Sequence, residues 1–287
     1  MTEKVAIVTD SSACIPQDFV EEYGIELVPL NVVFGGRIYQ DGVDISPAQF
    51  YALLREAKEL PTTAHSSVGA HLEAYRRASR RASSILCITL SAKFSGQFNS
   101  ARVAMEMAKN ALPEVIIDVL DCGTAAAAQG FVVLAAARAA ASGQSLASVI
   151  EAARRVMESV TLLAMVDTLN YLVRGGHVPK LAAMASSLFR IKPLFTLNGG
   201  DVRPLARARA TPGAIKRMLR IMKQKAIEGQ PLHVAVMHAD ALDNALALKA
   251  QISSQFDCAE LFITEFTPVM GVHIGPGLIG VAFYSGD

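Results

Sequence analysis

Short apolar runs and longer amphipathic segments alternate along the first half of this chain of 287 residues. The short runs are rich in β-branched residues and are typical of buried strands. They lie at residues 5–8, 25–28, 85–89 and 115–120. The segment at 48–58 has helical spacing and follows Ser46 and Pro47, a favoured helix start. Strands that alternate with helices predict a mostly parallel sheet covered by helices on both faces.

The pattern changes near residue 159. Further strands are predicted at 162–166, 234–238 and 261–266. Glycine pairs predict two hairpins, one over 31–39 and one over 193–204. We therefore predict an α/β protein of two α/β domains. Residues 1–159 would hold the mostly parallel sheet, and residues 160–287 would hold a mixed sheet.

The composition indicates a folded protein with much apolar surface to account for. Hydrophobic residues make up 52% of the chain, which excludes intrinsic disorder. The longest uncharged stretch, residues 266–286, does not predict a membrane span because prolines and glycines interrupt it repeatedly. The apolar run at 5–8 begins too early for a secretory signal peptide. We therefore expect a soluble, cytoplasmic protein.

Charge and cysteine usage narrow the function classes. The 27 basic and 26 acidic residues nearly balance, which argues against a surface built throughout for nucleic acid or an anionic membrane. The four cysteines lie far apart and form no CxxC pair, so neither a local metal cage nor a disulfide framework is expected.

One local run of charge stands out against this balance. The stretch from Arg203 to Lys225 holds eight basic residues and no acidic one. Such a run is usually one solvated helix face, and it could also dock an acidic partner or steer a phosphate. It carries no interleaved aromatic residues, which disfavours a groove for single-stranded nucleic acid.

Hydroxyl groups follow two of the predicted strands. The Asp10-Ser11-Ser12 turn comes directly after the first strand, at the sheet edge where ligands collect in open α/β sheets. Its other interpretation is a cap for a helix starting at Pro16. Ser95 and Gly96 precede a predicted helix over 101–110, and a helix N-terminus favours an anion. An ordinary capped helix is the alternative here as well. Because GxxxxGK[ST] and GxGxxG are both absent, the pattern predicts a small-anion site rather than a nucleotide loop.

Two further segments carry groups that could hold a ligand. Thr62 and Thr63 belong to a hydroxyl-rich segment, 61–67, which we expect to be a loop between helices. His273 lies among three glycines and a proline in 271–277, which we also expect to be a loop. Such a histidine either hydrogen-bonds a carbonyl or holds a carboxylate near neutral pH. We favour the second role, because a loop with so many glycines is a poor packing element.

Taken in order, these motifs resemble the DegV family of bacterial fatty-acid-binding proteins. The matching segments are Thr9-Asp10-Ser11-Ser12-Ala13, residues 39–45, Leu60-Pro61-Thr62-Thr63, residues 90–101, Val119-Leu120-Asp121, residues 169–176, Ile191-Lys192-Pro193 and residues 273–277. They span almost the whole chain in the family's order, and the set is highly specific. The chain departs from the family's usual residues at Ala64, Ser66, Ala92, Cys122 and His177. None of these is a presumed carboxylate ligand.

The resemblance implies a fold and a ligand site. An acyl chain would lie in a tunnel between or beside two α/β domains. Its carboxylate would be held by Thr63, Ser95, Gly96 and His273, with Ser11, Thr62 and Ser91 in support. No metal and no cofactor is implied apart from the bound fatty acid.

The resemblance also implies a role without catalysis. A long-chain fatty acid would be presented to a separate ATP-dependent fatty acid kinase, which phosphorylates its carboxylate. Arg174 of the Arg-Gly-Gly motif and Arg209 would face that partner or a phosphate. A transient contact with a membrane surface is compatible with this role, and no nucleic acid is expected as a partner.

An enzyme is the competing hypothesis. Ser95 or Ser11, together with His273 and Asp10, would resemble the arrangement of a hydrolase that acts on a small ester. The sequence has no GxSxG nucleophile elbow, which favours the carrier.

Overall fold

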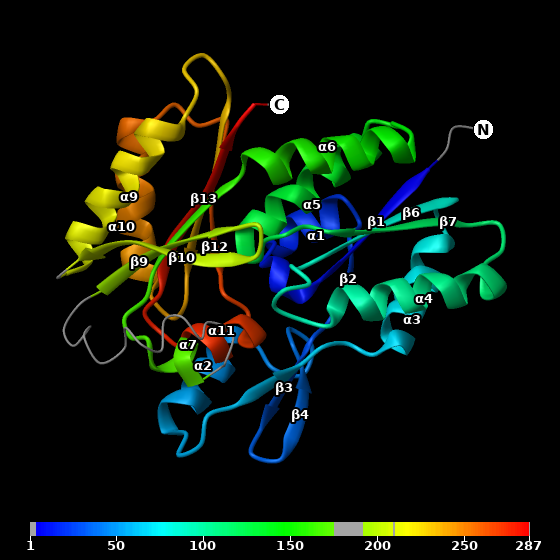
Figure 1. The fold of residues 1–287 in the computed structure, drawn as a ribbon, viewed down its shortest axis with the longest axis horizontal. Helices are drawn as coiled ribbons and strands as arrows, with labels where there is room; N and C mark the ends of the chain where they lie inside the picture. The colour runs from blue at the N-terminus through cyan, green and yellow to red at the C-terminus, as the bar shows by residue number, and fades with distance from the viewer. Residues whose placement is uncertain (1–3, 175–191, 209, 287) are drawn as a thin grey trace.

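The computed structural model describes residues 4–174, 192–208 and 210–286 (Figure 1). Four of the predicted strands form a parallel sheet in the order β2-β1-β6-β7. They are β1 (Val5–Asp10), β2 (Glu26–Val28), β6 (Ser84–Thr89) and β7 (Ile116–Asp121). The chain crosses over in opposite directions from the central pair, so the carboxyl ends of β1 and β6 form the topological switch point of the sheet.

Helices cover both faces of the parallel sheet, as the alternation of elements predicts. On one face, α3 (Val68–Ser79) and α4 (Gln97–Ala111) pack against Val8 and Cys87. Ile7 and Ile88 point to the opposite face and pack in a core with α5 (Ala126–Ala141). Because successive side chains of a strand alternate between faces, both sides of the sheet are apolar. The short helices η1 (Ser11–Ala13) and α1 (Gln17–Glu22) connect β1 to β2.

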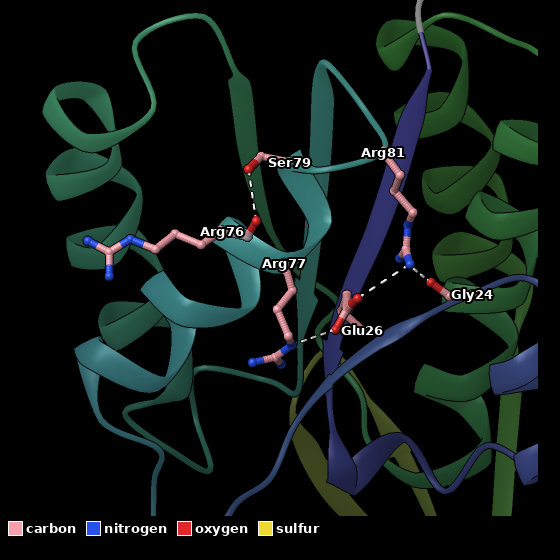
Figure 2. A network of polar contacts seen from close by, with 6 residues as sticks. All are labelled: Gly24, Glu26, Arg76, Arg77, Ser79 and Arg81. Carbon is pink, nitrogen blue, oxygen red and sulfur yellow. Dashed lines mark hydrogen bonds and ion pairs between the residues drawn. The ribbon is translucent and has the colours of Figure 1, made fainter.

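An ion-pair network joins the end of α3 to the edge strand β2 (Figure 2). The Glu26 carboxylate accepts from Nε of Arg77 at 3.0 Å and pairs with Nη1 of Arg81 at 3.4 Å. Arg81 also donates to the carbonyl of Gly24, and the Ser79 hydroxyl donates to the carbonyl of Arg76 at 2.9 Å. The Arg77 and Arg81 contacts hold the end of α3 to the edge of the sheet, whereas the Ser79 contact lies within the helix.

The second half forms a six-stranded mixed sheet in the order β10-β9-β8-β13-β11-β12. Its strands are β8 (Thr161–Met165), β9 (Lys192–Asn198), β10 (Asp201–Ala208), β11 (Leu232–His238), β12 (Glu260–Glu265) and β13 (Ile279–Ser285). The predicted hairpin around Gly199 and Gly200 is confirmed as the β9–β10 pair. Helices α9 (Thr211–Lys225) and α10 (Leu242–Gln255) cover the outer face (Figure 1).

Helices α5 and α6 (Leu146–Ser159) lie between the two sheets (Figure 1). Twelve residues of α5 are buried, most of them small, which lets neighbouring elements approach its axis closely. The largest apolar cluster runs through this layer from Ile7 and Ile88 to Ala282 and Tyr284 on the mixed sheet. The layers are therefore helix, sheet, helix, sheet and helix. The division into domains at residue 159 stays a prediction, because one core is shared across it.

A small antiparallel sheet, β4-β3-β5, extends from the carboxyl end of β2. The predicted hairpin is confirmed as β3 (Asn31–Phe34) and β4 (Arg37–Gln40), with φ of +57° and +76° at Gly35 and Gly36. The expectation of a loop over 61–67 was wrong in part, because β5 (Thr62–Ala64) pairs with β3. Helix α2 (Pro47–Glu56) begins at a capping box formed by Ser46 and Gln49, as its sequence predicts.

The expectation of a loop over 271–277 was wrong in part, because residues 271–274 belong to a helix, whereas residues 275–277 form a turn after it. Helix α11 (Pro268–Ile274) places Gly271 against α2. A Cβ atom built on Gly271 would lie 2.7 Å from a ring carbon of Phe50 and 2.8 Å from the hydroxyl of Tyr51. Glycine therefore serves close packing here, the role that seemed least suited to it. The remaining short helix, α7 (Asn170–Arg174), packs beside α11. Among the described residues, no helix is long and apolar enough to cross a membrane.

Candidate functional site

A cavity of about 160 Å³ lies between the two sheets, against the carboxyl ends of β1 and β6. Its walls come from β8, β9, α7, α11 and the start of α5. Most lining side chains are apolar, such as Ala164, Leu172, Phe195 and Met270. No Lys, Arg, Asp or Glu stands among the described lining residues. The cavity therefore suits a hydrophobic ligand, and it lies where open α/β sheets bind ligands.

The cavity is elongated, and apolar side chains line most of its length. Leu162, Leu197 and Val202 are register neighbours on β8, β9 and β10 and line one part of it. Further along, Val166 follows β8, from which the chain continues into α7, and α7 packs against α11. The register neighbours therefore lie at the end of the cavity away from α11.

Polar groups gather at the α11 end. The hydroxyl of Thr63, on β5, lies 3.0 Å from Nε2 of His273, on the last turn of α11. Ser95 and His65 line the cavity beside them. The ring of His65 packs against Gly96, where a Cβ atom would lie 3.3 Å from its Nδ1. Two hydroxyls and two imidazoles therefore face the same end of an otherwise apolar space.

The start of α4 contributes its backbone to this polar end. Gly96 is the N-cap residue of this 15-residue helix and, having no side chain, cannot cap it. The Ser95 hydroxyl accepts from the backbone N–H of Gln97 at 3.3 Å. The helix dipole favours negative charge here, as the sequence predicts for an anion near Ser95 and Gly96.

A buried glutamine holds the two sides of the polar end together. Gln97 is fully buried, and its Oε1 accepts from the backbone N–H of Ser66 at 2.9 Å. Its Nε2 donates to the Ser66 hydroxyl at 3.0 Å, which in turn donates to the carbonyl of Pro29. Gln97 therefore fixes the segment after Thr63 against the start of α4. Sequence analysis did not identify it, because its partner lies 31 residues away.

Behind the cavity wall, Asp10 forms the centre of a second polar network. It accepts from the backbone N–H groups of Leu90 at 2.9 Å and Ser12 at 3.1 Å, and from Nε2 of Gln129 at 3.2 Å. Burial raises the pKa of Asp10, and these hydrogen bonds act to lower it. The Ser12 hydroxyl contacts the same carboxylate and lines the cavity. Sequence analysis selected its neighbour Ser11 instead.

Residues 4–286 match the family described as "Uncharacterised protein, DegV family". The chain belongs to the DegV family. A DegV domain-containing protein of Streptomyces coelicolor is 37% identical over 287 residues, which covers 99% of this chain and 100% of that protein.

Two solved DegV structures share the fold over nearly the full length. One is described as "Fatty Acid Binding of a DegV family Protein from Thermus thermophilus", with a TM-score of 0.91, 30% identity, and coverage of 98% of this chain and 99% of that one. The other is described as "DegV, a fatty acid binding protein from Bacillus subtilis", with a TM-score of 0.89, 29% identity and 99% of both chains covered. The predicted α/β fold, with its parallel and mixed sheets, is thereby confirmed.

Of the four residues expected to hold a carboxylate in this DegV protein, Thr63, Ser95 and His273 line the cavity and Gly96 adjoins it. The three supporting residues do not line it. Ser11 is buried and donates to Asp41, Thr62 is exposed on β5, and the Ser91 hydroxyl accepts from the backbone of Lys93. Ser12 and His65, which were not predicted, line the cavity.

The two arginines expected at a partner surface are not both described. Arg174 is the last described residue of α7. Arg209 lies outside the described residues, as do residues 175–191, which include the two glycines of the Arg-Gly-Gly motif. The described part of the basic stretch forms a groove on the outer side of the DegV mixed sheet. Arg207, Lys216, Arg217 and Arg220 line it beside Leu194, whereas the next residue, Phe195, faces the cavity.

Two members of the hydrolase alternative lie in other hydrogen-bond networks. Asp10 and Ser11 are bonded to groups other than His273. Hydroxyls, an imidazole and a helix start can hold a small anion. The apolar walls can hold a chain attached to it.

Proposed function

We propose that this DegV protein binds a long-chain fatty acid, with the tail in the cavity and the carboxylate at Thr63, Ser95, Gly96 and His273. The observation that carries the proposal is a long apolar cavity with polar groups at one end and no Lys, Arg, Asp or Glu among its described lining residues. The descriptions of the Thermus and Bacillus relatives as fatty-acid-binding proteins support the same ligand class.

The energetics agree with this division of roles. Each buried methylene contributes about 0.8 kcal/mol, so a long acyl chain contributes on the order of 10 kcal/mol before ordering costs. The polar end then needs only to offer hydrogen-bond partners to the carboxylate and does not have to supply most of the affinity. Hydroxyl groups and His273 meet this need, because a carboxylate buried without partners would be costly.

We further propose that the protein is a carrier without catalytic activity. It would present the carboxylate to a separate ATP-dependent kinase for acyl-phosphate formation. The basic groove at Arg207, Lys216, Arg217 and Arg220 supports contact with an acidic or phosphorylated partner. Arg174 and Arg209 keep their proposed place at that partner surface, and transient contact with a membrane surface would allow the protein, proposed to be cytoplasmic, to take up fatty acid from the membrane.

Extraction of the purified protein tests the ligand. Organic solvent should release close to one long-chain fatty acid per protein chain, identified by mass spectrometry. A delipidated sample should take up palmitate again. If no fatty acid is recovered and none binds when added, the proposal fails.

Variants of the polar end test the head-group site and the absence of catalysis. Ser95→Ala combined with His273→Ala should weaken palmitate binding and leave the thermal unfolding profile close to that of the parent. Unchanged affinity would remove both residues from the site. Steady turnover of a small ester by the parent protein, lost in the same variant, would instead establish the hydrolase.

A further inference from the structure

Helix α11 carries His273 but lacks an acidic residue of its own to cap it. Its N-cap residue, Thr267, makes no side-chain cap hydrogen bond within the helix, and the first turn holds no Asp or Glu. The group that meets the helix start comes from 228 residues earlier in the chain. Oδ1 of Asp41 accepts from the backbone N–H of Val269 at 3.2 Å. A carboxylate at a helix N-terminus satisfies a free N–H group and opposes the helix dipole.

Asp41 is itself held rigidly from two sides. Its side chain is buried, and Oδ2 accepts from the Ser11 hydroxyl at 2.6 Å. The Ser11 hydroxyl accepts in turn from the backbone N–H of Leu30 at 3.2 Å, and the Asp41 N–H donates to the carbonyl of Leu30 at 2.9 Å. The turn after β1, the start of β3 and the end of β4 therefore converge on one carboxylate.

This carboxylate is expensive to bury. Burial raises the pKa of Asp41 to about 6, and nearby Asp10 adds to the rise, although hydrogen bonds from Ser11 and Val269 oppose it. A neutral amide could accept from Val269 without that cost. The charge is therefore better explained by what it does to α11 than by a contribution to stability.

The helix start is linked directly to the polar end of the cavity. Val269 and His273 are four residues apart, so they lie on the same face of α11, and both line the cavity. On the other side of the helix, Gly271 packs against Phe50 and Tyr51, whose hydroxyl donates to the carbonyl of Phe266 at 3.2 Å. With α11 clamped in this way, its position decides where His273 meets Thr63.

We propose that Asp41, supported by Ser11, is a positioning residue that caps α11 from another part of the chain and thereby sets His273 for the ligand head group. The role of Ser11 is then to hold Asp41 and not to touch the ligand. The part that concerns the ligand rests on the proposed function. The part that concerns His273 does not.

The first experiment uses the ligand-free protein. Asp41→Asn is compared with Asp44→Asn, a matched control in the same turn whose exposed carboxylate accepts only from the Gln40 backbone among the described residues. In Asp41→Asn we expect a shifted imidazole ¹⁵N signal for His273, assigned from its loss in His273→Ala. Hydrogen exchange at the Val269 amide should be at least about tenfold faster. Unchanged His273 and Val269 signals in Asp41→Asn would overturn the proposal.

The second experiment separates positioning from general stability. Asp41→Asn should bind palmitate about tenfold more weakly, the size expected for a disturbed charge-assisted contact, and should bind hexadecanol within about threefold of the parent. In a His273→Ala background the same substitution should change palmitate affinity less than about twofold. At pH 8 the unfolding temperature of the single variant Asp41→Asn should equal or exceed that of the parent. The positioning role would be refuted if Asp41→Asn lost equal affinity for palmitate and hexadecanol. It would also be refuted if the substitution caused its full loss of palmitate affinity in the His273→Ala background.

Ser11→Ala provides a second variant that leaves Asp41 in place. It should shift the His273 signal in the same direction by a smaller amount, whether or not Asp41→Asn folds. A Ser11→Ala protein with a parental His273 signal would contradict the proposed support. If the parent protein binds no fatty acid at all, the proposed function fails, and the ligand-free signals still decide the role of Asp41.

Discussion

Replacing Gly271 by Ala tests whether the position of α11 depends on its close packing against α2. A Cβ atom there would lie 2.7 to 3.0 Å from atoms of Phe50 and Tyr51, compared with an ordinary contact of 3.4–4 Å. These two rings are 0% and 1% exposed, so they have no open space to move into. The helix must therefore shift away from α2 by several tenths of an ångström.

The magnitude follows from two opposing effects. Overpacking of a filled core costs about 1–3 kcal/mol. Alanine in place of glycine within a helix regains about 0.5–1 kcal/mol. The net loss should be up to about 2.5 kcal/mol, which lowers the unfolding temperature by up to roughly 4 °C in a protein of this size. Because the shift moves His273 relative to Thr63, palmitate affinity should fall as well.

Gly69→Ala is the matched control. Gly69 also lies in a helix, α3, but its added Cβ would find only the Ser67 hydroxyl, at 3.7 Å. We expect this variant to gain about 0.5–1 kcal/mol and to bind palmitate as the parent does. Thermal unfolding followed by circular dichroism and palmitate titration measure both variants. If Gly271→Ala unfolds at or above the parental temperature with parental affinity, the packing argument is wrong.

Three further outcomes are expected. Thr63→Val removes the hydroxyl beside the His imidazole at nearly constant volume and should weaken palmitate binding by about tenfold in a titration; parental affinity would exclude that hydroxyl from the site. Val202→Phe fills the end of the cavity away from α11, so palmitate should bind roughly tenfold or more weakly while decanoate changes little, and equal losses for both acids would contradict that placement. Although burial opposes it, hydrogen bonds from His233 and Arg138 lower the pKa of Glu260 to about 2. Its ionised form therefore contributes about 3 kcal/mol of stability above pH 4.5 that is lost as the pH falls towards 2. Glu260→Gln should flatten denaturant midpoints measured across this range, and a parental slope would count against the ion pairs.

Strands β1 and β6 were predictable because burial on both faces makes each of them a continuous apolar run. Helix α11 was not predictable from its neighbours in sequence. Its one glycine and one proline, followed directly by residues 275–277, are typical of a loop, and the packing that stabilises it comes from Phe50 and Tyr51, more than 200 residues away. Strand β5 is only three residues long and exists as the partner of β3, so no local pattern indicates it.

The site divides in the same way. Thr63, Ser95 and His273 were identified through resemblance, and the structure brings them to one end of one cavity. Gln97 and Asp41 were missed because their roles arise from partners 31 and 228 residues away. A polar residue that is buried by distant segments leaves no periodic signal in its own neighbourhood. The cavity is subject to the same limit, since its walls come from both sheets.

The order of strands in the mixed sheet has a consequence for synthesis on the ribosome. Strand β13 lies inside the sheet, between β8 and β11, yet it is the last of that sheet's strands to be translated. Until it emerges, β8 with its hairpin and β11 with β12 remain two separate pieces, and α5 lacks the side chains of Ala282 and Tyr284 that cover it. Through the second half of its elongation the nascent chain therefore carries an apolar helix that is covered on the side of β1 and α6 only, and such exposed apolar surface favours aggregation until β13 is added.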